Sequence, residues 1–144
     1  MAFTTNLSNS ELARVAAAAY EGLAVRVSLH NKGATGFDQN STIANWDTVK
    51  LAAANGYADF VLDPLPAGGY DATDGRYEMG GAGANTYITA SFTGAGSGFT
   101  YNTVVIRIAS ATYPHSIISE SPSVSVAPGA TQTYTIQLLA AKIA

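Results

Sequence analysis

The sequence contains no cysteine and little charge. Without cysteine there is neither a disulfide nor a thiolate metal site, so a small disulfide scaffold is excluded and the core must form by packing alone. Charged residues make up 12% of the 144 residues, about half of the roughly 25% that is usual for a soluble domain. No run of residues is long and apolar enough to cross a membrane as a helix, and we expect no membrane partner.

Positive charge in particular is sparse and dispersed. The formal net charge is −3, and the seven cations stand singly along the chain. They are Arg14, Arg26, Lys32, Lys50, Arg76, Arg107 and Lys142. No basic stripe is present for phosphates, so nucleic acid is not an expected partner. The first six residues lack the positive region and apolar core of a signal peptide, which favours synthesis in the cytoplasm.

One short helix is predicted near the N-terminus. Ser8 and Glu11 have the spacing of a capping box, in which each residue satisfies a backbone N–H at the start of a helix. A narrow apolar stripe of mostly small side chains follows at helical spacing. It consists of Leu12, Val15, Ala16 and Ala19. We therefore expect an extended arm over residues 1–7 and a single β-rich domain over residues 8–144.

The remainder of the chain has the pattern of β-strands. Residues 25–30 alternate between Val or Leu and polar side chains, which indicates a half-buried strand. Residues 46–54 suit either a strand or a short helix, and we favour the strand. Further strands are expected at 57–62, 86–93, 103–110, 117–126 and 131–139. Glycine-rich residues 94–98 and the Pro128–Gly129 pair predict turns. Short strands with frequent turns favour an antiparallel β-sandwich or jelly roll.

Two groups of residues invite a metal-site interpretation. Residues 71–78 contain three carboxylates beside a glycine, as a calcium loop requires, but they lack a terminal bidentate glutamate and include Arg76. A solvated Asp-Gly turn is the preferred interpretation. The only histidines, His30 and His115, would both be needed for zinc together with distant acids. We predict no metal and no cofactor.

No pattern of a known catalytic site stands out. There is no Gly-x-Ser-x-Gly elbow, and neither glycine-rich stretch, 80–83 or 94–98, ends in Lys-Ser or Lys-Thr. We expect His30 on the surface at the end of a strand and His115 at a turn. The sequence therefore favours a protein that is not an enzyme.

Tyrosine dominates the aromatic residues, with eight tyrosines against five phenylalanines and one tryptophan. A tyrosine ring packs while its hydroxyl stays hydrogen-bonded, which suits partly buried interfaces. We predict interface roles for tyrosines near expected loops and for a phenylalanine on the arm. These residues are Phe3, Tyr70, Tyr77, Tyr101 and Tyr113. A carbohydrate-binding β-sandwich that uses Trp46, Tyr70 and Tyr101 is the alternative use of the same residue types.

Three segments resemble the small β-rich structural proteins of tailed-bacteriophage particles. They are the short helix ending in Ala16–Ala19, the glycine-rich residues 80–98, and residues 124–136, which look like the final hairpin of many virion β-domains. The resemblance implies a capsid cement or decoration protein that acts in the virion, binds the major capsid protein or other virion proteins, and forms a homo-oligomer, with a trimer favoured. A tail, collar or fibre-associated component is the alternative placement.

Overall fold

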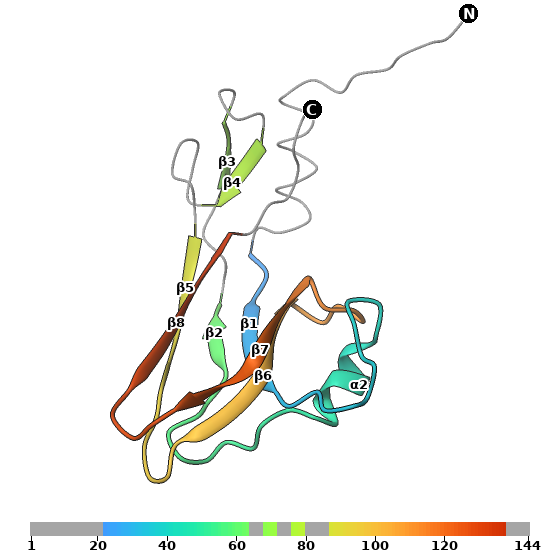
Figure 1. The fold of residues 1–144 in the computed structure, drawn as a ribbon. Coiled ribbons are helices and arrows are strands. Elements are labelled where there is room, and N and C mark those ends of the chain that lie inside the picture. The colour runs from blue at the N-terminus through green and yellow to red at the C-terminus, as the bar shows by residue number, and fades with distance from the viewer. Residues whose placement is uncertain (1–21, 64–67, 72–75, 80–86, 138–144) are drawn as a thin grey trace, which may run out of the picture. The chain divides into compact units, whose positions relative to one another are not determined.

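The computed structural model describes residues 22–63, 68–71, 76–79 and 87–137, and over these the protein is mainly β (Figure 1). The contacts divide the chain into two compact units, one of which holds residues 24–63 and 89–134. The expected arm over residues 1–7, with Phe3, and the expected helix that starts near Ser8 lie outside the described residues. No helix among the described residues is long and apolar enough to span a bilayer.

A four-stranded antiparallel sheet has the order β2-β1-β6-β7 (Figure 1). Its strands are β1 (Val25–His30), β2 (Phe60–Leu62), β6 (Phe99–Ile108) and β7 (Ser116–Val126). A second sheet pairs β5 (Tyr87–Thr93) with β8 (Thr131–Gln137), and a third pairs β3 (Gly68–Asp71) with β4 (Arg76–Met79). The only helix among the described residues is α2 (Ile43–Asp47).

Strand β1 forms as its alternating pattern predicts, but its polar face is covered at two of its three residues and exposed only at Arg26. Val25, Val27 and Leu29 are fully buried on one face and oppose aliphatic residues of β6 in register. On the other face Ser28 and His30 are also buried, at 0% and 1% exposed. The expectation that His30 lies on the surface is therefore wrong. The cause is the segment containing α2, which returns over this face of β1.

The predicted strand over residues 46–54 is also wrong, because α2 occupies its first two residues and a turn, an isolated bridge and irregular chain follow. Thr42 caps the helix, since its side-chain oxygen accepts a hydrogen bond from the backbone N–H of Asn45 at 3.2 Å. Only Lys50 retains strand character, as an isolated bridge to His30. Asn55 and Gly56 then reverse the chain with positive φ angles of 53° and 86°.

The later strands lie where the sequence places them, within a few residues, but their pairing differs. The Pro128–Gly129 turn is present: Gly129 has φ 79°, and the N–H of Ala130 donates to the carbonyl of Ala127 at 3.0 Å. The strands on either side do not form the expected hairpin, because β8 pairs with β5 and not with β7. Two backbone hydrogen bonds hold this turn against the β5–β6 turn. The N–H of Gly129 donates to the carbonyl of Gly94 at 2.8 Å, and the N–H of Gly94 donates to the carbonyl of Ala130 at 2.9 Å.

Glycine is required where these two turns meet. Gly98 has φ 73°, and a Cβ atom on it would collide with the carbonyl oxygen of Val126. Gly129 has a similar φ of 79°, but a Cβ atom there would meet nothing within 4 Å. Comparing substitutions at Gly98 and Gly129 therefore separates two contributions to stability. One is the cost of a positive φ for a residue with a side chain, and the other is the cost of a collision with the neighbouring strand.

We expect Gly129→Ala to lower the free energy of unfolding by about 1 kcal/mol, because alanine disfavours positive φ. Gly98→Ala should cost clearly more, since β7 must also move away from the new methyl group. Urea denaturation of both variants measures the difference. Equal losses would contradict the close approach of the two turns.

Candidate interaction surface

The strands β5 to β8 carry almost no charge. Between Glu78 and Lys142 only Arg107 and Glu120 are charged, and both are engaged within the fold. Arg107 Nη1 lies 3.2 Å from Asp47 Oδ1, and Glu120 Oε1 accepts a hydrogen bond from the Tyr134 hydroxyl at 2.8 Å. The outer surface of these strands is consequently built from neutral side chains.

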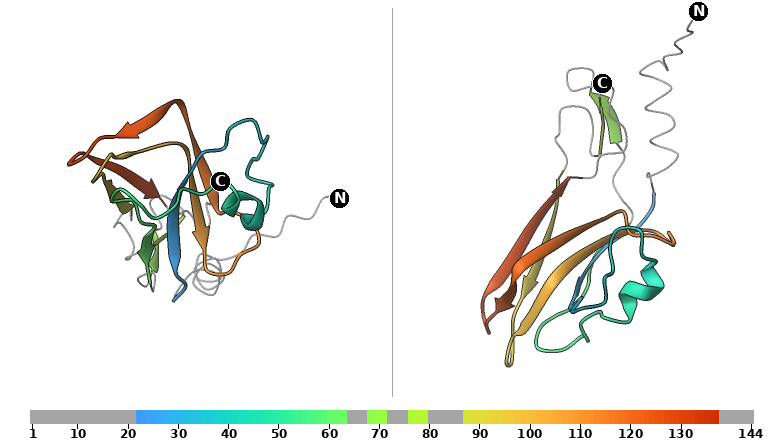
Figure 2. Two further views of the ribbon diagram at one scale, coloured as in Figure 1. Left: turned by 90° about the horizontal axis from the view of Figure 1, so that it is seen from below. Right: turned by 45° about the vertical axis from the view of Figure 1, so that its right-hand side comes forward.

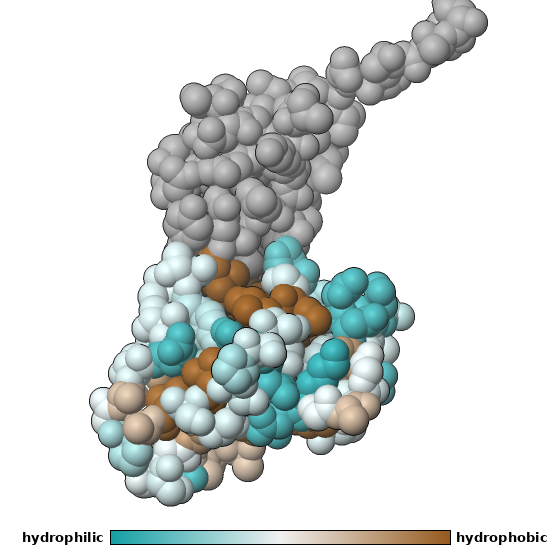
Figure 3. Space-filling view, in the orientation of Figure 1, coloured by the Kyte–Doolittle hydropathy of each residue, from teal (hydrophilic) through white to brown (hydrophobic). Residues whose placement is uncertain are grey.

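Exposed hydroxyl groups on this surface pair across neighbouring strands. Ser91 and Thr133 are 3.0 Å apart and Thr93 and Thr131 are 2.8 Å apart, in both cases between β5 and β8. Thr100 of β6 and Ser125 of β7 form a third pair at 2.9 Å. In Figure 3 the residues over β7 and β8 are mostly pale, with brown apolar patches, whereas strongly hydrophilic residues gather on the side of α2. Hydroxyl groups that already pair with each other cost little to cover.

A shallow groove of about 490 Å³ lies where β6 begins and β7 ends. Its lining combines hydroxyl groups with apolar side chains and contains no charged residue. The lining residues are Ser97, Gly98, Phe99, Thr100, Ser125, Val126, Ala127 and Pro128. The groove extends the neutral strand surface, and we call the two together the neutral β surface.

The aromatic residues that the sequence singled out fall in different places. Tyr113 is 53% exposed in the loop between β6 and β7, where a partner can reach it. Tyr70 and Tyr77 are register partners in the β3–β4 hairpin, so they lie in strands and not in loops. Tyr101 is 0% exposed, so its assignment to an interface is wrong. Strand β6 begins at Phe99 and carries Tyr101 into the interior.

The Tyr101 hydroxyl belongs to a chain of hydrogen bonds across three strands. It lies 2.6 Å from the Tyr134 hydroxyl of β8, which in turn donates to Glu120 of β7 at 2.8 Å. Because Tyr134 uses its proton for Glu120, Tyr101 is the donor of the first bond. Burial, together with this hydrogen bonding, raises the pKa of Tyr134 far above its usual value. The Tyr134 hydroxyl therefore keeps its proton at neutral pH, and both hydrogen bonds persist. It links the two sheets that meet at β6 and β8.

Tyr134→Phe should lower the free energy of unfolding by about 1 to 3 kcal/mol, because it leaves the buried Tyr101 hydroxyl without its acceptor. Thermal or chemical denaturation measures this loss. Tyr113→Phe is the matched control, since it removes a hydroxyl from an exposed ring and should change stability by less than about 0.5 kcal/mol. Similar losses in both variants would mean that the hydrogen-bond chain contributes nothing specific.

A second buried polar group joins β1 to α2. His30 Nδ1 lies 2.9 Å from the Trp46 carbonyl oxygen, and His30 Nε2 lies 2.8 Å from Ser28 Oγ. Burial lowers the pKa of His30 to about 4, so the ring is neutral at pH 7. Nδ1 therefore carries the proton and donates to the carbonyl, while Ser28 donates to Nε2. The histidine thus acts as a neutral hydrogen-bond tether.

Ser28 and His30 have the separation of a nucleophile and its general base, but both are buried. A backbone carbonyl, not a carboxylate, accepts from Nδ1. A substrate cannot reach a serine that is 0% exposed, and the pair is explained as part of the core. His115 lies in the loop before β7, as expected. No group of three or more metal-binding side chains occurs among the described residues.

Two of the three aromatic residues proposed for the alternative function, carbohydrate binding, are buried. Trp46 is 0% exposed, and its indole N–H donates to the carbonyl of Asp38 at 3.1 Å. Tyr101 is buried as well. Neither ring offers a face on which a sugar could stack.

Asp59 gathers three cations around it, a cluster that the dispersed cations of the sequence did not predict. Asp59 Oδ2 lies 2.6 Å from Lys50 Nζ, 3.2 Å from Arg26 Nη1 and 3.9 Å from Arg107 Nη2. Asp59 Oδ1 accepts from the Tyr57 hydroxyl at 2.6 Å. Burial alone would raise the pKa of Asp59, but its hydrogen bonds to Lys50 and Tyr57 and the nearby positive charge hold it below its usual value.

Comparison with known proteins places the chain in no family: no protein-family model, no curated protein and no solved structure matches it.

Proposed function

We propose that the chain is a structural protein of a virus particle, and specifically a capsid cement or decoration protein of a tailed bacteriophage. In this proposal it is a β-sandwich or jelly-roll module that forms homo-oligomers, with a trimer favoured. It binds the major capsid protein or other virion proteins and catalyses no reaction. The observation that carries the proposal is the neutral β surface, where β5 to β8 present paired hydroxyl groups and no unpaired charge.

The chemistry of this surface suits repeated contact with protein. Covering a charge costs free energy, whereas covering paired hydroxyls and apolar side chains costs little. Each contact is weak, but a shell repeats it at every symmetry-related position. Copies that touch neighbours as well as the shell gain from the high effective concentration. Tyr113, which is 53% exposed, adds an aromatic side chain that a partner can cover.

The first experiment measures the copy number of the chain in purified particles of the virus that encodes it, by quantitative mass spectrometry against the major shell protein. A cement protein should be present in hundreds of copies, because shell sites repeat with the capsid symmetry. About a dozen copies would overturn the cement role and move the chain to the neck, tail or fibre, where axial rings bind few copies. Absence from particles would overturn the whole proposal.

A charge on the neutral β surface should prevent attachment. We expect Ser125→Lys to reduce binding to shells about tenfold or more, because the ammonium group would be desolvated in the contact without a partner. Gln39→Lys is the control, since it adds the same charge at an exposed position in the loop before α2. Binding is measured by co-sedimentation with shells that lack the protein. Equal binding of both variants would exclude this surface from the contact.

A further inference from the structure

A second surface, chemically unlike the neutral β surface, lies where β1 meets β2. Arg26 of β1 is the register partner of Val61 of β2, so the two side chains lie side by side on one face of the sheet. The Val61 residue is 47% exposed and the Arg26 side chain 48% exposed. The Lys50 side chain, 27% exposed, meets Arg26 at the same Asp59 oxygen. We call Arg26, Lys50 and Val61 the Arg26–Val61 patch.

Positive charge exceeds negative charge around Asp59. Lys50, Arg26 and Arg107 approach its carboxylate, and Arg107 also pairs with Asp47. The cluster itself, which does not include the exposed Asp63, thus holds three positive charges and two negative ones. Arg107 is largely covered, with 14% of its side chain exposed, so the excess is accessible through Arg26 and Lys50. An arginine that gives one nitrogen to Asp59 still has donors in the fork geometry that a carboxylate accepts.

Val61 adds an exposed apolar side chain to the charged residues of the patch. Among the described residues Val61 and Tyr113 are the large hydrophobic side chains that stand exposed. Val61 lies on β2, an outer strand of the four-stranded sheet. An exposed aliphatic side chain beside two accessible cations fits a partner in which an apolar residue neighbours a carboxylate.

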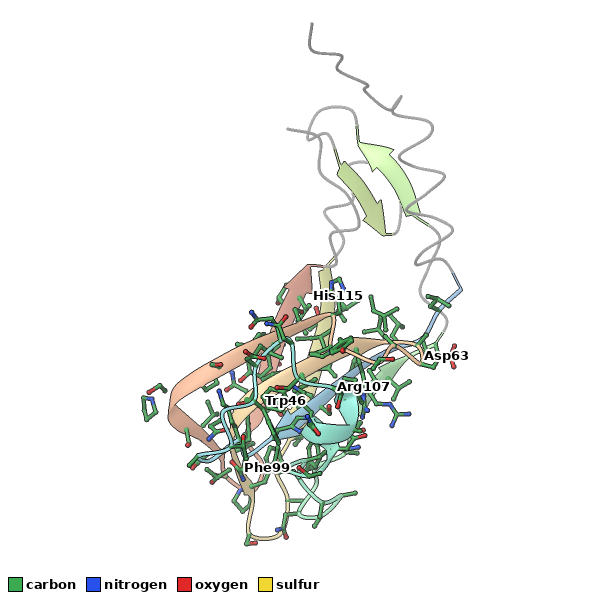
Figure 4. The ribbon with its side chains drawn as sticks, turned by 90° about the vertical axis from the view of Figure 1, so that its right-hand side faces the viewer. Trp46, Asp63, Phe99, Arg107 and His115 are labelled. Carbon is green, nitrogen blue, oxygen red and sulfur yellow. The ribbon has the colours of Figure 1, made fainter. Side chains whose placement is uncertain are left out.

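We propose that the Arg26–Val61 patch binds an acidic segment of a partner protein in which a carboxylate adjoins an aliphatic residue. The carboxylate pairs with Arg26 and Lys50 while the aliphatic side chain covers Val61. The proposal is independent of the proposed function, because the neutral β surface forms no part of it. In Figure 4 Phe99, which lines the groove, and Asp63, which follows β2, are labelled well apart, Phe99 low in the view and Asp63 at the right.

Asp63 gives the site a direction. It is exposed and lies two residues beyond Val61, a separation of about 7 Å along an extended chain. Its negative charge repels a carboxylate at that end of the patch. The acidic residue of the partner should therefore contact the patch on the side away from Asp63, where Arg26 and Lys50 meet at Asp59, and removal of the Asp63 charge should strengthen binding.

The test uses two blocked peptides on the full chain, one alternating Glu and Val and one alternating Lys and Val. Binding is followed by NMR chemical shifts. The acidic peptide should shift signals of Arg26, Lys50 and Val61, and the basic peptide should not. Raising the salt concentration from about 50 mM to about 0.3 M should weaken binding several-fold, because it shortens the range of the charge interaction.

Four substitutions decide between the patch and non-specific attraction. Arg26→Gln and Val61→Ser should each weaken binding about fivefold or more, and Asp63→Asn should strengthen it about twofold. Lys32→Gln, which removes a cation outside the Asp59 cluster, should leave binding unchanged. Thermal denaturation shows that each variant is folded. Shifts at other residues, equal binding of the basic peptide, no binding, or equal loss from Lys32→Gln would each overturn the proposal.

Discussion

Replacing Trp46 with alanine should lower the free energy of unfolding by about 3 to 5 kcal/mol, the cost of removing a large buried aromatic side chain. Trp46 is 0% exposed, and its ring packs edge-on against His30 at 5.6 Å and Phe37 at 5.7 Å between ring centroids. It lies in α2, the only helix among the described residues, and holds that segment on the sheet (Figure 2). Its loss removes the cover from the polar face of β1.

Chemical denaturation followed by circular dichroism measures the effect. Trp46→Phe should cost less than Trp46→Ala, because it keeps part of the packed ring and loses only the indole hydrogen bond to the Asp38 carbonyl, which still accepts from the N–H of Ser41. Tyr113→Ala is the matched control, since this aromatic side chain is 53% exposed and should change stability by less than about 0.5 kcal/mol. A loss below about 1 kcal/mol for Trp46→Ala would contradict the burial of α2 against the sheet.

The strands could be predicted wherever local periodicity and turn chemistry agreed. Strand β1 shows the alternation of Val25, Val27 and Leu29, and the Pro128–Gly129 pair marks a turn that the structure contains. Partner choice could not be predicted, because it depends on contacts between distant segments. The hydrogen bonds of Gly94 to the 127–130 turn lead the chain into a second sheet where a hairpin was expected.

The same distinction explains the residues whose environment was misjudged. His30 is covered because Trp46 of α2, 16 residues further along the chain, folds back on it, and no pattern around His30 predicts that contact. Tyr101 looked like a loop residue because the expected strand begins only at Thr103, where a run of mainly apolar residues starts, whereas β6 begins at Phe99. The low charge over residues 79–141 can be read from the sequence. The pairing of Ser91, Thr93 and Thr100 with hydroxyl groups on other strands could not be predicted, because it depends on which strands become neighbours in the fold.

The free energy of unfolding should fall with pH in two successive ranges, and His30 contributes to the first of them. Its pKa is about 4 in the folded protein, below the ordinary value of 6.5, because burial disfavours the charged ring. Between pH 6.5 and pH 4 the unfolded chain binds a proton that the folded protein does not. Stability is therefore fully present above pH 6.5 and falls with the pH by about 1.4 kcal/mol per unit, for a total of about 3 kcal/mol from this residue. Asp59, whose pKa lies below its ordinary 3.8, contributes stability that is lost only at still lower pH.

Denaturant titrations at pH 7, 6, 5 and 4 on the wild type and on His30→Gln separate this contribution from all others. The glutamine amide can donate to the Trp46 carbonyl but cannot titrate, so the variant should lose the slope between pH 6 and pH 4.5 whatever its stability at pH 7. His115→Gln is needed beside it, because burial lowers the pKa of His115 too and adds a slope of the same sign. NMR of the folded protein should show the His30 ring neutral at pH 5. A His30 titration near pH 6.5, or an unchanged slope in His30→Gln, would mean that water reaches the ring and that the tether between β1 and α2 opens in solution.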